Sequence, residues 1–103
     1  MRADVARRLK SRGWKVGDAT ELLGLSDQEA ALVELRLALS RSVRERRLKL
    51  GLSQLDLASR LGSSQSRVAK LEGADATVSI DLLVRGLLAL GATRREIGRA
   101  LAE

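Results

Sequence analysis

Residues 52–72 read LSQLDLASRLGSSQSRVAKLE, and this segment decides the fold of the chain. It predicts two short helices joined by a turn at Gly62 and Ser63. Such short helices cross steeply only where the residue at the contact is small and the turn tolerates a positive φ, and Ala58 and Gly62 meet these needs. The side chains that we expect to face inward between the two helices are Leu55, Ala58, Leu61, Val68 and Leu71.

The rest of the chain is predicted to be helical as well. It contains no proline, and its leucines recur mostly at intervals of three and four residues. Glycines separate the helix-sized pieces, and the predicted capping pairs are Asp18 with Glu21, Ser26 with Glu29, Ser53 with Asp56 and Thr93 with Glu96. The predicted helices cover residues 3–12, 18–23, 27–50, 54–61, 65–73, 80–90 and 94–102, which makes the fold class all-α.

The composition excludes several classes of protein. The chain has 103 residues, which suffice for one compact domain. It has no histidine and no cysteine, which excludes Cys/His zinc sites, Ser-His-Asp and Cys-His nucleophiles and disulfides. We therefore expect no enzymatic activity, no cofactor and no metal. No apolar stretch approaches the roughly 20 residues of a membrane span, and residues 1–15 do not resemble a secretory signal, so we expect a prokaryotic, cytoplasmic protein that does not bind membranes.

The charge of the chain favours nucleic acid as a partner. The formal net charge is +6, and it is divided into +5 over residues 1–15, −5 over residues 16–35 and +5 over residues 36–51. Trp14 is the single aromatic residue, so the stacking platform that single-stranded nucleic acids and RNA require is absent. These features point to duplex DNA. A plain solvated face explains a run of charge equally well, and that alternative stays open here.

Residues 43–91 carry an ordered set of elements that resembles the helix-turn-helix domain of the Xre family, the group of the lambda-type repressors. The elements are Arg47, Gly51-Leu52-Ser53-Gln54, Leu57-Ala58, Gly62, Ser64-Gln65-Ser66-Arg67-Val68, Leu71-Glu72, Ser79, Leu82-Leu83 and Leu87 to Gly91. The resemblance implies a compact five-helix lambda-repressor-like DNA-binding domain over residues 35–103. Residues 1–34 would form a basic arm and an N-terminal helical extension.

The family resemblance also assigns roles to individual residues. Residues 65–73 would be the recognition helix in the major groove, with Gln65, Ser66 and Lys70 facing the bases. Gln54, Ser64 and Arg67 would contact the DNA backbone, and Arg44 and Arg60 are weaker candidates for the same role. Ser64 as a plain helix cap and Lys70 as an exposed helix residue are the structural alternatives. Arg47 and Glu72 would form a structural salt bridge instead of contacting DNA.

A second resemblance covers residues 14–18, WKVGD, and the segment LLGLSDQEAALVELRLALS that follows. Together they are similar to the extension of HigA-like antitoxins. This likeness implies the antitoxin of a type II toxin-antitoxin pair, which would repress its own operon and bind a small basic ribonuclease toxin. A stand-alone phage-type repressor without a toxin partner is the alternative.

We expect a homodimer that binds double-stranded DNA at a palindromic operator, because one such domain covers few base pairs. The leucines and isoleucine of the last two helices exceed what one small core needs, although burial in that core is the competing explanation. The residues predicted for the dimer surface are Leu82, Leu87, Leu90, Ile97 and Leu101.

Overall fold

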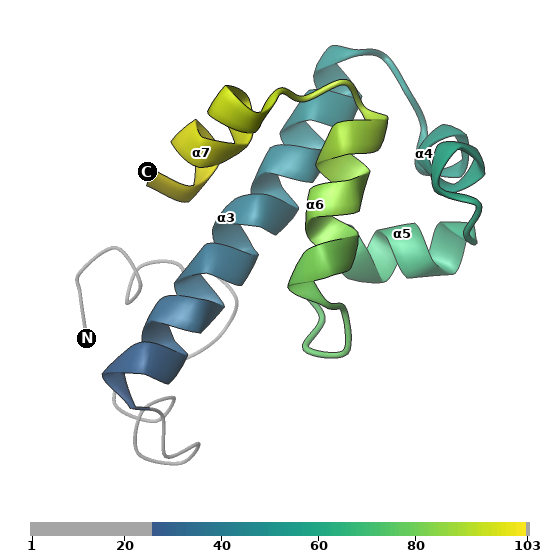
Figure 1. Cartoon of the computed structure of the whole chain (residues 1–103). Coiled ribbons are helices and arrows are strands. Elements are labelled where there is room, and N and C mark those ends of the chain that lie inside the picture. Colours follow the sequence, from purple (N-terminus) through teal and green to yellow (C-terminus); the bar gives the residue numbers. More distant parts are fainter. Residues whose placement is uncertain (1–25, 103) are drawn as a thin grey trace. The chain divides into compact units, whose positions relative to one another are not determined.

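The computed structural model describes residues 26–102, and this part of the chain contains five helices and no strand (Figure 1). The helices are α3 (Asp27–Lys49), α4 (Gln54–Leu61), α5 (Gln65–Glu72), α6 (Ile80–Ala89) and α7 (Arg94–Ala102). The all-α prediction is confirmed, and the predicted ends of these helices are correct to within one residue. The helices predicted over residues 3–12 and 18–23, and the cap at Asp18, lie outside the described residues.

Side-chain caps fix the starts of the helices. Ser53 and Asp56 form a reciprocal capping box at α4, in which the Asp56 N–H donates to Ser53 Oγ at 3.0 Å and the Ser53 N–H donates to Asp56 Oδ2 at 2.8 Å. The bond from the Ser53 N–H holds the pKa of Asp56 below its usual value. Thr93 and Glu96 make the same reciprocal pair at α7. The turn between α4 and α5 depends on Gly62, whose φ of +63° is strained for any residue with a Cβ.

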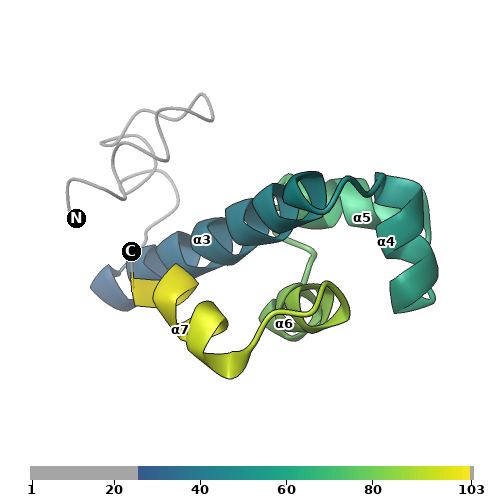
Figure 2. The same ribbon diagram turned by 90° about the horizontal axis from the view of Figure 1, so that it is seen from above.

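One apolar core joins α4, α5 and α6 to the second half of α3 (Figure 2). The buried members of this core are Leu39, Val43, Leu57, Ala58, Val68, Leu71, Val78, Leu83, Leu87, Leu90 and Ala92. Helix α6 comes close to α3 and α5 at Gly86, where a Cβ would lie 3.6 Å from Val43 Cγ2 and 3.7 Å from Leu71 Cδ1. The boundary between the two compact units of the chain falls between Leu37 and Ala38, inside α3, so this core belongs wholly to the second unit.

Two predictions about individual leucines were wrong. Leu55 is 64% exposed, and the fully buried residue of α4 is Leu57. At 100° per residue, Leu57, Ala58 and Leu61 share one side of this helix, whereas Leu55 lies on the far side.

The second error concerns the predicted dimer surface. Leu87 and Leu90 are core residues with 1% and 3% exposure, so they are not available to a second copy of the chain. Leu82 and Ile97 are partly buried against the same core, and Leu101 is 38% exposed. Four of the five residues predicted for the dimer surface are therefore buried in the core or packed against it.

Arg46 fastens α7 to the rest of its unit. Its Nε donates to the Leu90 carbonyl at 3.0 Å, and its Nη2 donates to the Gly91 carbonyl at 3.0 Å. Its Nη1 donates to Glu96 Oε2 at 2.8 Å. The hydrogen bond from Arg46, helped by those from Thr93, lowers the pKa of Glu96 from 4.5 to about 2.

This clamp predicts an acid-sensitive contribution to stability. The pKa of Glu96 is lower in the folded state, so its stabilising effect is complete above about pH 5 and is lost as the pH falls from 4.5 toward 2. We expect thermal unfolding to separate Glu96→Gln from the wild type at pH 6 to 7, and the two melting temperatures to converge near pH 2. Asp81→Asn is the matched control, because Asp81 is an exposed carboxylate in the first turn of α6. A gap between Glu96→Gln and the wild type that does not change with pH would contradict the assignment.

Candidate nucleic-acid interface

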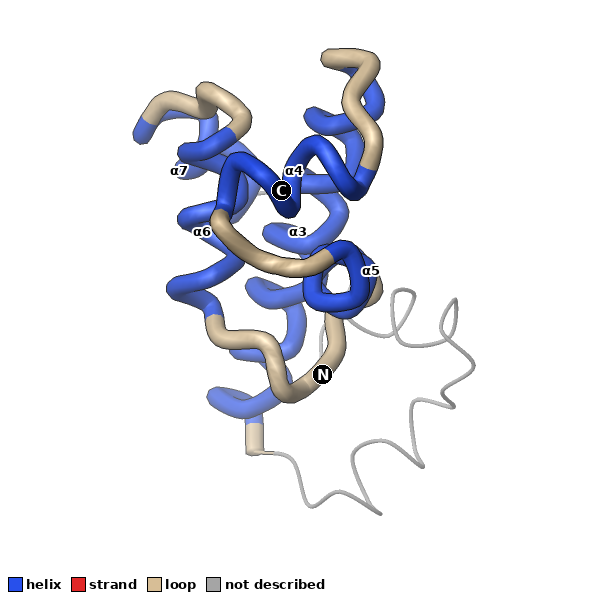
Figure 3. Tube along the Cα trace, turned by 90° about the vertical axis from the view of Figure 1, so that its right-hand side faces the viewer, coloured by secondary structure: helices blue, strands red, loops and turns tan. Residues whose placement is uncertain are grey.

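Helix α5 has two chemically different sides. Val68, Leu71 and Glu72 are buried. The exposed residues are Gln65, Ser66, Arg67, Ala69 and Lys70. Figure 3 looks along α5 and shows how the helix lies at the edge of its unit, next to α4. The exposed side thus offers an amide, a hydroxyl and two cations, and none of its residues is acidic.

The N-terminus of α5 is capped by Ser64. Its Oγ accepts a hydrogen bond from the Arg67 N–H at 3.2 Å and lies 3.2 Å from Ser66 Oγ. The helix cap that was the structural alternative for Ser64 is therefore present, and it is compatible with a contact to DNA. The N–H groups of Gln65 and Ser66 remain at the exposed end of the helix, where the positive end of the helix dipole favours a phosphate.

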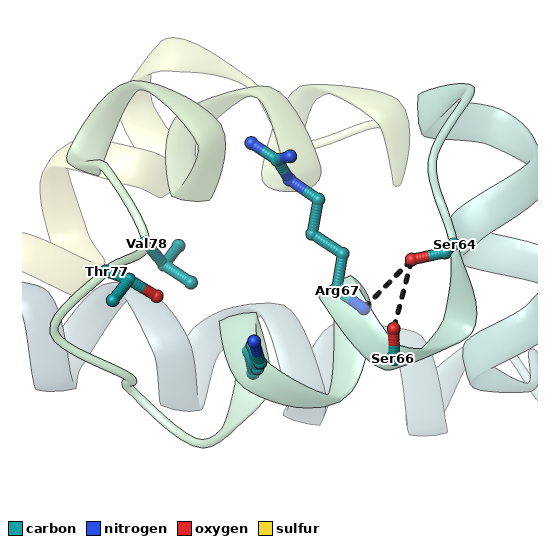
Figure 4. A pocket seen from close by; sticks show the side chains of 6 residues that line it. Ser64, Ser66, Arg67, Thr77 and Val78 are labelled. Atoms are coloured by element: carbon teal, nitrogen blue, oxygen red, sulfur yellow. Dashed lines mark hydrogen bonds between the residues drawn. The ribbon is translucent and has the colours of Figure 1, made fainter.

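A shallow cavity of about 270 Å³ lies between α5 and the loop that leads to α6 (Figure 4). Its lining residues are Ser64, Ser66, Arg67, Lys70, Thr77 and Val78. In Figure 4 the Arg67 side chain extends away from α5, between the labelled serines and the Thr77 loop. Hydroxyls and cations dominate this lining, so the cavity suits an anion such as a phosphate.

Thr77 and Val78 are site residues that the sequence analysis missed. The Thr77 hydroxyl and N–H donate to Asp75 Oδ1 at 2.5 and 2.8 Å. Both bonds lower the pKa of Asp75, and the bond from the Thr77 hydroxyl is the larger cause. The pattern Asp75-Ala76-Thr77 is a recognisable signal for a side-chain-stabilised turn, and it was the clue available in the sequence.

Arg47 and Glu72 lie in a buried, bidentate ion pair. Arg47 Nε donates to Glu72 Oε2 at 2.5 Å, and Arg47 Nη2 donates to Glu72 Oε1 at 2.9 Å. The remaining Nη1 donates to the Leu52 carbonyl at 2.7 Å. The hydrogen bond to Glu72 raises the pKa of Arg47. The pair ties the end of α3 to the last turn of α5.

Gln54, at the start of α4, is half-buried and adjoins this pair. Its Nε2 donates to Glu72 Oε1 at 3.3 Å. Gln54 does not line the cavity beside α5. The predicted site residues that do line it are Ser64, Ser66, Arg67 and Lys70. Gln65 is exposed on α5 outside that lining.

Ser40 is a further contact that the sequence analysis missed. Its Oγ donates to the Leu71 carbonyl at 2.6 Å and is fully buried. A serine in the middle of a long helix points to solvent or bonds back to the carbonyl four residues earlier, and nothing in the local sequence marks this one as a partner of residue 71. It gives α3 a second hold on the last turn of α5.

The three acidic residues of the segment 52–75 have structural roles. Asp56 caps α4, Glu72 pairs with Arg47, and Asp75 holds the turn before α6. Arg67 and Lys70 face solvent. Glu72 is the one acidic residue of α5 and is buried, so the exposed side of this helix is positive, although residues 52–75 contain three acidic and three basic residues.

Arg44 and Arg60, the two weaker candidates for contacts to the DNA backbone, differ in their contacts within the fold. Arg60 donates from Nη1 to the Ala89 carbonyl at 3.3 Å, so part of its guanidinium is used within the fold. Arg44 is exposed on α3.

Residues 26–102 contain neither a candidate metal site nor a candidate membrane span. No cluster of three or more acidic side chains within residues 26–102 is arranged to hold a metal ion. In the same range, no helix combines the length and the apolar character needed to span a bilayer.

Comparison with known proteins gave one match. A family model described as helix-turn-helix matches residues 43–97, which is more than half of the chain. Searches of curated proteins and of solved structures found no match.

Proposed function

Because the chain belongs to the Xre-like helix-turn-helix family and is a DNA-binding transcriptional regulator, we propose that it is a homodimeric repressor of a palindromic operator. In this proposal each protomer lays α5 into the major groove of one half-site. The half-sites of such a dimer lie about 34 Å apart, one turn of the double helix.

The observation that carries the proposal is the exposed side of α5. Gln65 can pair with N6 and N7 of adenine, and Lys70 can donate to O6 and N7 of guanine. The Ser66 hydroxyl can donate or accept a hydrogen bond, so it can contact either kind of base edge. The cavity beside α5 would receive a backbone phosphate, with Ser64 and Arg67 as donors. Gln54 would donate to a second phosphate at the start of α4.

Substitutions on α5 should separate base contacts from phosphate contacts. Binding is measured by gel shift on the promoter of the protein's own operon and on unrelated DNA. We expect Gln65→Ala and Lys70→Ala each to weaken operator binding by about 1–3 kcal/mol while leaving unrelated DNA nearly unaffected. Arg67→Ala should weaken both by a similar factor, because a phosphate contact carries no sequence information.

Arg95→Ala is the control for these variants. Arg95 is an exposed arginine of α7, which lies away from α5 in Figures 1 and 2. Its loss removes the same charge without touching the proposed interface. Equal losses for Gln65→Ala, Lys70→Ala and Arg95→Ala on both DNAs would contradict the assignment of base contacts.

We propose in addition that the repressor is the antitoxin of a type II toxin-antitoxin pair and represses its own operon in the prokaryotic cytoplasm, on the nucleoid. The resemblance of residues 14–40 to HigA-like antitoxins supports this role. The start of α3 supports it as well, because it exposes the acidic Asp27 and Glu29 and the apolar Leu32 and Leu35, at 45% and 36% exposure. A mixed acidic and apolar surface suits a small basic ribonuclease toxin.

Co-expression with the adjacent reading frame tests the antitoxin role. We expect a small basic protein to co-purify with the wild type, and Asp27→Lys combined with Leu32→Glu to abolish co-purification without changing operator binding. Operator binding without any such partner would instead support the stand-alone phage-type repressor.

A further inference from the structure

The carboxylate of Glu72 has more partners than an ion pair requires. Its side chain is 4% exposed, and it accepts three hydrogen bonds. Two come from Arg47 and the third comes from Gln54, at 3.3 Å from Nε2 to Oε1. The same oxygen, Oε1, accepts from both residues. Glu72 is thus the point at which the buried pair meets the side chain at the start of α4.

This contact fixes which way the Gln54 amide faces. The Arg47 guanidinium has donors and no acceptor, so both oxygens of Glu72 accept hydrogen bonds in this pair. An ionised carboxylate can only accept hydrogen bonds, so Gln54 must turn its Nε2, and not its Oε1, toward Glu72. One Nε2–H is then used inside the protein, and the second is left as a donor.

We propose that Glu72 is a positioning residue for DNA binding, which holds the Gln54 amide so that its second Nε2–H donates to a backbone phosphate. The inference rests on the proposed function, because it assumes that Gln54 contacts DNA. A glutamine that is already held loses less side-chain entropy when it binds. Arg47 also has a part in this arrangement, since it neutralises a carboxylate that would otherwise lie close to the phosphate and repel it.

A double-mutant cycle tests the coupling by combining Gln54→Ala with the paired change of Arg47→Met and Glu72→Leu. The paired change removes both oxygens of residue 72, so the Gln54 amide loses the acceptor that holds it. It also leaves no buried charge without a partner. Affinity for the operator is measured by fluorescence anisotropy at one salt concentration, with circular dichroism to check that each variant is folded.

We expect Gln54→Ala and the paired change each to weaken operator binding about 10- to 100-fold, as the loss of one hydrogen bond to a charged group predicts. The combined variant should be no more than about twofold weaker than Gln54→Ala alone, because both changes remove the same contact. Additive effects would show that Glu72 does not act through Gln54 and would overturn the proposal.

A measurement on the wild type keeps the test independent of the stability of the paired variant. The side-chain amide of Gln54 should show an NMR order parameter close to the roughly 0.85 of rigid backbone, while that of Gln65 should fall below about 0.6. Gln65 is the matched control, because it is an exposed glutamine at the same position of the next helix. Equal mobility of the two amides in the free protein would overturn the proposal.

The failure of this inference can be distinguished from the failure of the proposed function. If Gln65→Ala and Lys70→Ala weaken operator binding but Gln54→Ala does not, Gln54 does not contact DNA and the positioning role falls alone. If none of these variants changes operator binding, the assignment of α5 as the recognition helix falls with it.

Discussion

Arg47→Ala is expected to lower the free energy of unfolding by about 3–5 kcal/mol, the cost of leaving a buried carboxylate without its partner. Arg47 makes two bonds to Glu72 and one to the Leu52 carbonyl, and the pair is more than 90% buried on both sides. A domain of this size has a total stability of about 5–15 kcal/mol, so the loss is a large part of the whole. Urea unfolding followed by circular dichroism measures it.

The controls for Arg47→Ala separate structure from DNA contact. Arg95→Ala removes an exposed arginine and should change the free energy of unfolding by no more than about 0.5 kcal/mol. Arg47→Met combined with Glu72→Leu removes both charges and should recover much of the lost stability, because the main cost is the unpaired charge. An Arg47→Ala variant with an unchanged melting temperature that no longer binds DNA would make Arg47 a DNA contact and refute the structural assignment.

Operator affinity is expected to fall about 10³- to 10⁴-fold between 50 and 200 mM salt, if a dimer neutralises six to eight phosphates. The corresponding slope of log affinity against log salt is about −5 to −7. The physical cause is the release of counterions from DNA as cations such as Arg67 approach the backbone. Fluorescence anisotropy over a series of KCl concentrations gives the slope directly.

Two variants make this measurement diagnostic. Arg67→Ala removes one phosphate contact per protomer and should reduce the size of the slope by about 2 for the dimer. Gln65→Ala, which alters an uncharged side chain, should lower the affinity and leave the slope as it is. A flat salt response of the wild type would contradict DNA binding through this surface.

Local signals in the sequence predicted the helices well. The capping box of Ser53 and Asp56 and the glycine at position 62 act within a few residues of themselves, so the starts and the turn could be located from the sequence. The all-α fold follows from such signals and from the spacing of the leucines. The choice of Leu55 over Leu57 failed because both fit a helical repeat over so short a stretch, and only the packing of α4 against its neighbours decides between them.

Contacts between distant residues were the part that the sequence could not supply. Arg46 bonds to residues 44 to 50 positions away, and Ser40 bonds to a carbonyl 31 positions away. No local pattern encodes such pairs. The positive side of α5 was hidden for the same reason, because a count of charges does not reveal that Glu72, the one acidic residue of this helix, is buried against Arg47.

Three hydrogen bonds from two residues of α3, Ser40 and Arg47, reach the last turn of α5, and they bear on which changes of target the fold allows. Ser40 and Arg47 hold the helix through its buried side, so we expect α5 to keep its place in the fold on different base sequences. Gln65, Ser66 and Lys70 make no part of that attachment. On the proposed function, we therefore expect that exchanging these three exposed side chains changes the preferred operator while the stability of the fold stays nearly the same.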